Sequence, residues 1–316
     1  MATGAVMEAE INGVRLPYVE QGAGEPMVFV HGFVSDLRIW QPIKDEIAKK
    51  YRFIAYTQRY FGTGPWNDDG ELFSVGTLSD DLVKFIVSLK AGPVHLVAWS
   101  YGGQVATVAA LKNPSLVRSL ILYEPSVMSV LPEASAEGKI AREDRAKMFA
   151  PSVAASKAND SVKASRLLLE AVFRLPPGGS YRESEALQTM VEENARTTPL
   201  ALAATPPPDV TCDMLKNFSK PTLVIRGEKT HTAYVLINEA ISKFVPGAKQ
   251  VVLPNVNHDG PLRDPKQFSG AILEFLSYRR VKLRSVPLPR RAPPRWEAML
   301  AGSAKAKEQA RSEKGE

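Results

Sequence analysis

Ser100 stands in a segment that could supply a catalytic nucleophile. The segment reads Val94-His-Leu-Val-Ala-Trp-Ser-Tyr-Gly-Gly103: a predicted buried strand, then the serine, then the start of a predicted helix. A nucleophile on such a tight turn stands exposed above the sheet, and the crowded backbone needs small residues two before and two after it. Ala98 and Gly102 meet that need, although the usual pattern has glycine at both places. A serine that merely caps the helix would give the same local pattern.

The elements around this turn alternate between strand and helix. Strands are predicted at 26–30, 52–56, 94–98, 118–123, 222–226 and 250–253. Helices are predicted at 39–49, 77–89, 101–112, 234–244 and 265–278, and a hairpin that turns at Asn12-Gly13 precedes them all. This alternation predicts an α/β fold, with a mostly parallel central sheet flanked by helices.

The alternation stops at Glu124 and resumes only near Thr222. The residues between them indicate helices, at 142–148, 161–174 and 183–194, and no obvious strand. We therefore assign residues 1–125 and 209–278 to one α/β core, and residues 126–208 to a helical insertion. Residues 279–316 form a basic tail that has too few apolar side chains to fold, and we expect it to be disordered.

The positive charge of the chain belongs to this tail. The net charge is +6, but residues 279–316 hold 11 Lys and Arg against 4 acidic residues. The other residues hold 29 basic and 30 acidic side chains, so the body is close to neutral. We therefore expect no specific nucleic-acid partner, and only weak contact of the tail with anionic surfaces.

Several other classes of protein are excluded by composition. Cys212 is the single cysteine, so no intrachain disulfide can form. No apolar run approaches the roughly 18–20 residues of a membrane span, and the N-terminus lacks the pattern of a secretory signal. No His and Cys spacing indicates a metal, and no glycine loop indicates a nucleotide cofactor. We expect a cytoplasmic protein with a small-molecule substrate and neither metal nor cofactor, while the oligomeric state stays open.

Four motifs stand in a fixed order along the chain. They are Phe29-Val-His-Gly-Phe33 after an early strand, the turn at Ser100, Arg226-Gly-Glu228 at a strand end, and Val256-Asn-His-Asp259 after the last strand. Together they resemble the α/β-hydrolase family, over roughly residues 16–278. The resemblance implies the α/β-hydrolase fold and identifies the insertion with the helical cap that the family often carries over its active site.

The resemblance also implies a role for each motif. His258 is the base that takes the proton of Ser100, because a serine hydroxyl alone is a weak nucleophile. The backbone N–H groups of Phe33 and Tyr101 form the oxyanion hole that stabilises the tetrahedral intermediate. The histidine at the position of His31 is usually structural in the family.

The acid of a Ser-His-acid triad departs from the family pattern. Most members place an aspartate three residues after Gly227, where this chain has Thr230. A neutral residue in place of the acid cost about 10⁴ in rate in a serine protease, so either another acid substitutes or the activity is weak. We favour Glu124, because haloalkane dehalogenases of this fold carry their acid at the corresponding strand end. Glu228, or no acid at all, stays open.

The roles of two further polar residues stay open. His231 lies near the expected position of the acid. Arg59 could reach a substrate carboxylate or form a structural ion pair.

The predicted function is hydrolysis of a small ester, lactone or related carbonyl substrate through an acyl-enzyme, as in carboxylic ester hydrolases. Dehalogenases and epoxide hydrolases of the fold use an aspartate nucleophile, whereas position 100 is serine. One alternative is a non-catalytic binding protein that has lost the acid at position 230. Another is a cofactor-free perhydrolase or a hydrolase of carbon–carbon bonds, since both use the same triad.

Overall fold

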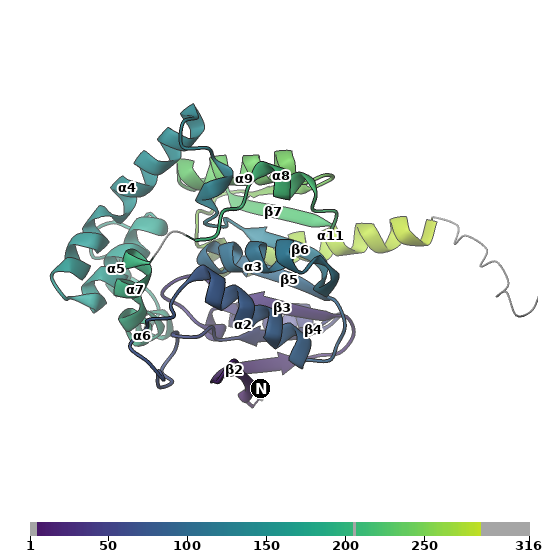
Figure 1. Cartoon of the computed structure of the whole chain (residues 1–316), viewed down its shortest axis with the longest axis horizontal. Coiled ribbons are helices and arrows are strands. Elements are labelled where there is room, and N and C mark those ends of the chain that lie inside the picture. Colours follow the sequence, from purple (N-terminus) through teal and green to yellow (C-terminus); the bar gives the residue numbers. More distant parts are fainter. Residues whose placement is uncertain (1–4, 205–206, 286–316) are drawn as a thin grey trace, which may run out of the picture. The chain divides into compact units, whose positions relative to one another are not determined.

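A sheet of eight strands runs through the protein in the computed structural model, which describes residues 5–204 and 207–285 (Figure 1). The strand order is β1-β2-β4-β3-β5-β6-β7-β8. The strands are β1 (Met7–Ile11), β2 (Val14–Gln21), β3 (Pro26–Val30), β4 (Arg52–Tyr56), β5 (Val94–Trp99), β6 (Val117–Tyr123), β7 (Thr222–Gly227) and β8 (Lys249–Leu253). β2 is antiparallel to both β1 and β4, and the other neighbours are parallel. The predicted fold class is confirmed.

Most of the helices outside the insertion connect parallel strands of this sheet, and two of them follow the last strand. They are α1 (Gln41–Ala48), α2 (Val75–Ser88), α3 (Ser100–Lys112), α8 (Cys212–Lys216), α9 (Thr232–Phe244), α10 (Gly260–Arg263) and α11 (Pro265–Ser285). Every residue of β3 and β5 is buried, as expected for central strands of a parallel sheet that is covered on both faces. The predicted hairpin turn is also present, with Asn12 and Gly13 both at positive φ.

The insertion between β6 and β7 is helical. Its helices are α4 (Ala136–Lys157), α5 (Ser161–Val172), α6 (Glu185–Glu193) and α7 (Thr198–Ala203), which gather at the left of Figure 1. No strand occurs among the described residues of 126–208. α4 is much longer than the predicted 142–148, because Ser135 caps its N-terminus and the helix continues through Pro151. The sheet and the insertion belong to one compact unit, Met1–Glu274.

Short 3₁₀ helices complete the connections. They are η1 (Leu37–Trp40), η2 (Pro114–Leu116), η3 (Met128–Val130), η4 (Gly179–Arg182) and η5 (Ala195–Thr197). Within the described ranges, no helix has the length and apolar character that a membrane crossing requires.

The end of α11 differs from the sequence prediction. The helix was expected to end at Tyr278, but it continues to Ser285. The added residues include Arg, Lys and Leu, which are good helix formers, and the first proline of the sequence beyond them is Pro287. The second compact unit, Phe275–Glu316, begins within this helix. Residues 286–316 of the predicted tail lie outside the described residues.

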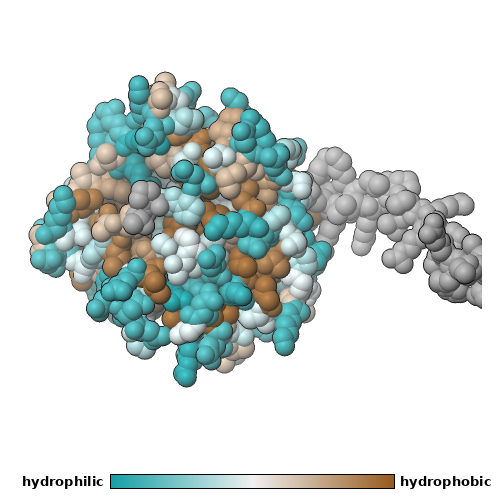
Figure 2. All heavy atoms as spheres, in the orientation of Figure 1, coloured by the Kyte–Doolittle hydropathy of each residue, from teal (hydrophilic) through white to brown (hydrophobic). Residues whose placement is uncertain are grey.

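The described surface has scattered apolar side chains. Figure 2 shows hydrophilic residues over much of the visible face, with apolar residues in small groups between them. The large exposed apolar residues come from separate elements: Val6, Leu72, Val87, Ile140, Val162, Tyr181, Met214 and Val252. Such scatter is ordinary for a protein surface and does not indicate an apolar docking surface.

Candidate active site

Ser100 occupies a strained turn between β5 and α3. Its φ is +55°, a left-handed conformation that is uncommon for residues other than glycine. Gly102 permits the turn, because a Cβ atom there would lie 2.2 Å from the carbonyl oxygen of His31, at the end of β3. The turn thereby brings the Ser100 side chain against Gly32 and into a pocket.

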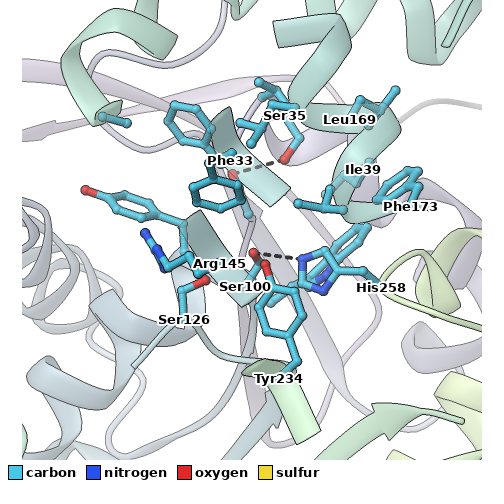
Figure 3. A pocket seen from close by; sticks show the side chains of 18 of the residues that line it. Phe33, Ser35, Ile39, Ser100, Ser126, Arg145, Leu169, Phe173, Tyr234 and His258 are labelled. Atoms are coloured by element: carbon cyan, nitrogen blue, oxygen red, sulfur yellow. Dashed lines mark hydrogen bonds between the residues drawn. The ribbon is translucent and has the colours of Figure 1, made fainter. Parts of the chain in front are cut away.

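A continuous chain of hydrogen bonds joins the three residues that the sequence singled out. The Oγ atom of Ser100 lies 2.9 Å from Nε2 of His258, and Nδ1 of His258 lies 2.6 Å from Oε2 of Glu124 (Figure 3 draws the first contact). A carboxylate can only accept, so Nδ1 carries the ring proton and donates it to Glu124. Nε2 is then the acceptor for the Ser100 hydroxyl, which is the arrangement that general-base catalysis needs.

Glu124 is fully buried, and three donors surround its carboxylate. Oε1 accepts from the backbone N–H of Gly227 at 2.7 Å, and Oε2 accepts from the hydroxyl of Thr230 at 2.7 Å as well as from His258. These bonds offset the cost of taking a carboxylate out of water. Thr230 therefore contacts the acid from the position where most relatives place their aspartate.

Glu228 and Asp259, two acids close in the sequence to Thr230 and His258, have other partners. Glu228 is exposed and accepts from the backbone N–H of Asn255 at 2.9 Å. Asp259 is buried and forms an ion pair with Arg263 at 2.7 Å. Glu124 is thus the acid that the structure brings to the imidazole.

Replacing Thr230 by valine is expected to lower the free energy of unfolding by about 1–2 kcal/mol. Valine has nearly the same shape but no hydroxyl, so the buried Oε2 of Glu124 loses one of its two donors. Urea denaturation measures this change. Thr232→Val is the matched control, because Thr232 is exposed in the first turn of α9. Equal losses in both variants would contradict the assigned bond.

Tyr234 holds the ring of His258 in place. The two rings are stacked, with centroids 4.2 Å apart and planes inclined by 12°. Burial raises the pKa of Tyr234 to about 12, so the phenol stays neutral near pH 7. Sequence reasoning missed this residue, although its place at the start of the helix after β7 could have drawn attention to it.

The two predicted oxyanion donors lie beside the serine. Phe33 and Tyr101 both line the pocket, and their rings contact each other with centroids 5.8 Å apart. Tyr101 is the second residue of α3, so its backbone N–H has no carbonyl one turn earlier to bind. Val34, next to Phe33, has a φ of +48°, which is a strained conformation for a β-branched residue.

His31 holds this segment in place through hydrogen bonds of its ring. It is fully buried, its Nε2 accepts from the backbone N–H of Gln58 at 3.0 Å, and its Nδ1 donates to the carbonyl of Gly32 at 2.8 Å. Burial lowers the pKa of His31 to about 4, so the ring is neutral near pH 7. Both nitrogens are used for structure, as the sequence predicts.

The pocket lies between the core and the insertion. The core contributes Ser100, His258 and the residues after β3, while the insertion contributes a mostly apolar wall. That wall consists of Arg145, Phe149, Leu168, Leu169, Val172, Phe173, Leu187, Ala201 and Leu202. Such a lining suits a small, largely apolar ligand.

Comparison with known proteins decides the family. A family model described as the alpha/beta hydrolase fold matches residues 25–265. The chain belongs to the α/β-hydrolase family. The curated relatives of this α/β-hydrolase include hydrolases that are 26% identical over most of its length, so it is a hydrolytic enzyme.

Individual relatives of this α/β-hydrolase span most of its length. A 2-(acetamidomethylene)succinate hydrolase of Mesorhizobium japonicum is 26% identical, and the match covers 84% of this chain and 93% of the relative. The solved structure of Est816, described as an N-acyl homoserine lactone degrading enzyme, is 26% identical with a TM-score of 0.66, over 85% of this chain and 100% of that one. A bromoperoxidase structure from Bacillus anthracis, 21% identical with a TM-score of 0.70 over 86% and 100%, shares the fold.

The two polar residues of this α/β-hydrolase whose roles the sequence left open, His231 and Arg59, make structural contacts. His231 occupies the N-cap position of α9, and its Nε2 lies 2.8 Å from the carbonyl oxygen of Ala171 in the insertion. Arg59 forms a buried ion pair with Asp81 at 2.6 Å, so it does not reach the pocket. No cluster of three or more His, Cys, Asp or Glu side chains suited to a metal occurs within residues 5–204 and 207–285.

Arg145 was also missed by the sequence reading. It lies on α4, and it lines the pocket together with Phe149 one turn later. The i, i+4 spacing of Arg145 and Phe149 places both on one face of the helix, but it does not indicate that this face meets the pocket of the α/β-hydrolase.

Proposed function

We propose that this α/β-hydrolase cleaves a small ester or lactone through a serine acyl-enzyme. Ser100 is the nucleophile, His258 the general base and Glu124 the acid of the triad. The observation that carries the proposal is the unbroken chain of hydrogen bonds from Oγ of Ser100 through the imidazole to Glu124. The insertion, residues 126–208, acts as the cap that encloses the substrate.

The acylation step follows from this geometry. Nε2 of His258 takes the hydroxyl proton while Oγ of Ser100 attacks the substrate carbonyl. The N–H groups of Phe33 and Tyr101 bind the oxyanion, and the positive end of α3 favours the same charge. Glu124 stabilises the imidazolium, which then protonates the leaving alcohol as the acyl-enzyme forms.

Water repeats these steps to release the acid. His258, neutral again, takes a proton from a water molecule that attacks the acyl carbonyl. The oxyanion hole stabilises the second tetrahedral intermediate, and Ser100 leaves with the proton that the imidazolium returns. For a lactone the alcohol and the acid leave as one molecule, so the ring is opened.

Two observations favour an ester or lactone as the substrate: the lining of the pocket and the similarity to Est816. Apolar side chains of the insertion face Ser100, which suits an organic ester more than a highly charged phosphate ester. Est816, described as degrading N-acyl homoserine lactones, is 26% identical over nearly its whole length. The alternative of a non-catalytic binding protein rested on Thr230, but Glu124 supplies a carboxylate at the imidazole.

A fluorophosphonate probe tests the proposed nucleophile. The wild-type protein is expected to gain one covalent label, because only an activated serine attacks the phosphorus. Peptide mass spectrometry should locate the label on Ser100, and Ser100→Ala should abolish it. Ser126→Ala is the matched control, since Ser126 lines the same pocket and should leave the label in place. Folded wild-type protein that takes no label would contradict the proposal and favour the binding protein.

A further inference from the structure

Arg145 brings a positive charge into the pocket that contains Ser100. The residue belongs to α4 of the insertion, and it lines the pocket together with Ser100, Ser126 and His258. Figure 3 shows Arg145 and His258 on opposite sides of Ser100. The guanidinium carbon lies over the ring of Phe149, 4.7 Å from its centroid, so the positive charge contacts the face of an aromatic ring.

This charge has no anionic partner among the residues that the structure describes. No hydrogen bond or ion pair among residues 5–204 and 207–285 includes Arg145. The two acids just before it on α4 are engaged elsewhere: Glu143 pairs with Lys147 at 2.7 Å, and Asp144 accepts from the backbone N–H of Ala233 at 2.8 Å. The contact with Phe149 is a cation–π contact, and no described residue accepts a hydrogen bond from the N–H groups of Arg145.

An unpaired cation in a pocket calls for an explanation. Burial lowers the pKa of Arg145, which reflects the cost of removing a charge from water without a counter-ion. Its titratable neighbour is the neutral phenol of Tyr234, which supplies no such counter-ion. The buried Arg59, in contrast, is fully paired with Asp81.

A second donor in the same pocket lacks a partner. The hydroxyl of Tyr101 is buried and has no hydrogen-bond partner among the described residues. A buried polar group without a partner in a binding pocket is commonly one that the ligand satisfies. Arg145 and Tyr101 thus both offer the pocket donor groups that no described residue binds.

We propose that Arg145 binds a carboxylate of the substrate, so that the preferred substrate is an ester or lactone that also carries a carboxylate group. A planar guanidinium and a carboxylate match in two parallel hydrogen bonds, which fixes orientation as well as affinity. The ester carbonyl would then lie at Ser100 while the carboxylate lies at Arg145. This inference rests on the proposed hydrolysis by Ser100.

Two esters of equal acyl length provide the kinetic test. Mono-p-nitrophenyl adipate ends in a carboxylate, whereas p-nitrophenyl hexanoate ends in a methyl group. The wild-type enzyme is expected to show a higher kcat/KM for the adipate ester. Arg145→Met should lower the ratio of the two kcat/KM values by at least about tenfold, and Arg145→Lys should lower it less.

Lys147→Met is the matched control for charge. Lys147 lies on the same helix and loses the same unit of charge, but it is exposed and does not line the pocket. Its ratio of kcat/KM values should equal that of the wild type. An equal fall of the ratio in Lys147→Met and Arg145→Met would overturn the proposal, because the effect would then be a long-range field. An unchanged ratio in Arg145→Met would overturn it as well.

A binding measurement separates this inference from the proposed catalysis. Calorimetry with adipate is carried out on Ser100→Ala and on the double variant with Arg145→Met. Binding that the double variant loses supports the carboxylate site, even if neither ester were hydrolysed and the proposed function failed. Hydrolysis of both esters with no adipate binding and no preference would overturn the carboxylate site and leave the hydrolase intact.

Discussion

Replacing Glu124 by glutamine is expected to lower kcat for ester hydrolysis by about 10⁴-fold. The carboxylate accepts from His258, Gly227 and Thr230, with at least one donor at each oxygen. An amide has only one acceptor oxygen, so its NH₂ group must face one of these donors. If the NH₂ faces His258, the imidazole is forced into the wrong tautomer, and in either orientation the imidazolium loses its counter-charge.

Glu228→Gln is the matched control for this result. It makes the same chemical change on an exposed side chain that accepts from the backbone N–H of Asn255, in the loop after β8. Its kcat on a p-nitrophenyl ester should stay close to that of the wild type. Circular dichroism establishes that Glu124→Gln is folded. A folded Glu124→Gln enzyme with wild-type kcat would show that the acid of the triad is elsewhere.

Replacing His258 by alanine is expected to lower kcat by about 10⁶-fold, the loss seen when the histidine of a serine protease triad is removed. Without Nε2 at 2.9 Å, nothing accepts the hydroxyl proton of Ser100 as the attack begins. The rate of fluorophosphonate labelling should fall with kcat, because labelling needs the same activated hydroxyl. The measurement is hydrolysis of a p-nitrophenyl ester together with labelling at fixed probe concentration.

Two comparisons make this second prediction specific. His231→Gln changes a histidine that contacts the insertion through Ala171, and it should retain most of the activity. Imidazole added to the buffer should restore part of the activity of His258→Ala, since the small base can enter the space that the ring leaves. If His231→Gln lost as much activity as His258→Ala, the assignment of the base to His258 would fail.

Much of the fold could be predicted because its signals are local. Buried strands read as short apolar runs, and the turn at Ser100 needs small neighbours that stand next to it in the sequence. Glu124 was also within reach, because the end of a parallel strand fixes the edge of the sheet where its side chain lies. The pairing of Glu124 with His258 follows once both strand ends are known.

Other features depend on contacts between distant segments. Thr230 looked like the loss of an acid, and only the fold shows that its hydroxyl donates to Glu124. Arg145 lies on α4, whose charged and small residues give little amphipathic signal. For the same reason the predicted helix stopped at Met148, although α4 continues to Lys157. Which face of such a helix meets the core is decided by tertiary packing.

The positive φ angles around the pocket have a consequence for engineering. Val34, Ser100 and Glu124 each hold a left-handed backbone conformation that glycine would adopt more easily. A selection for heat resistance alone would therefore favour glycine or asparagine at these places and would yield stable proteins with little or no activity. Substitutions that are meant to raise the thermal stability of this protein should leave these three positions unchanged and be placed in loops away from them.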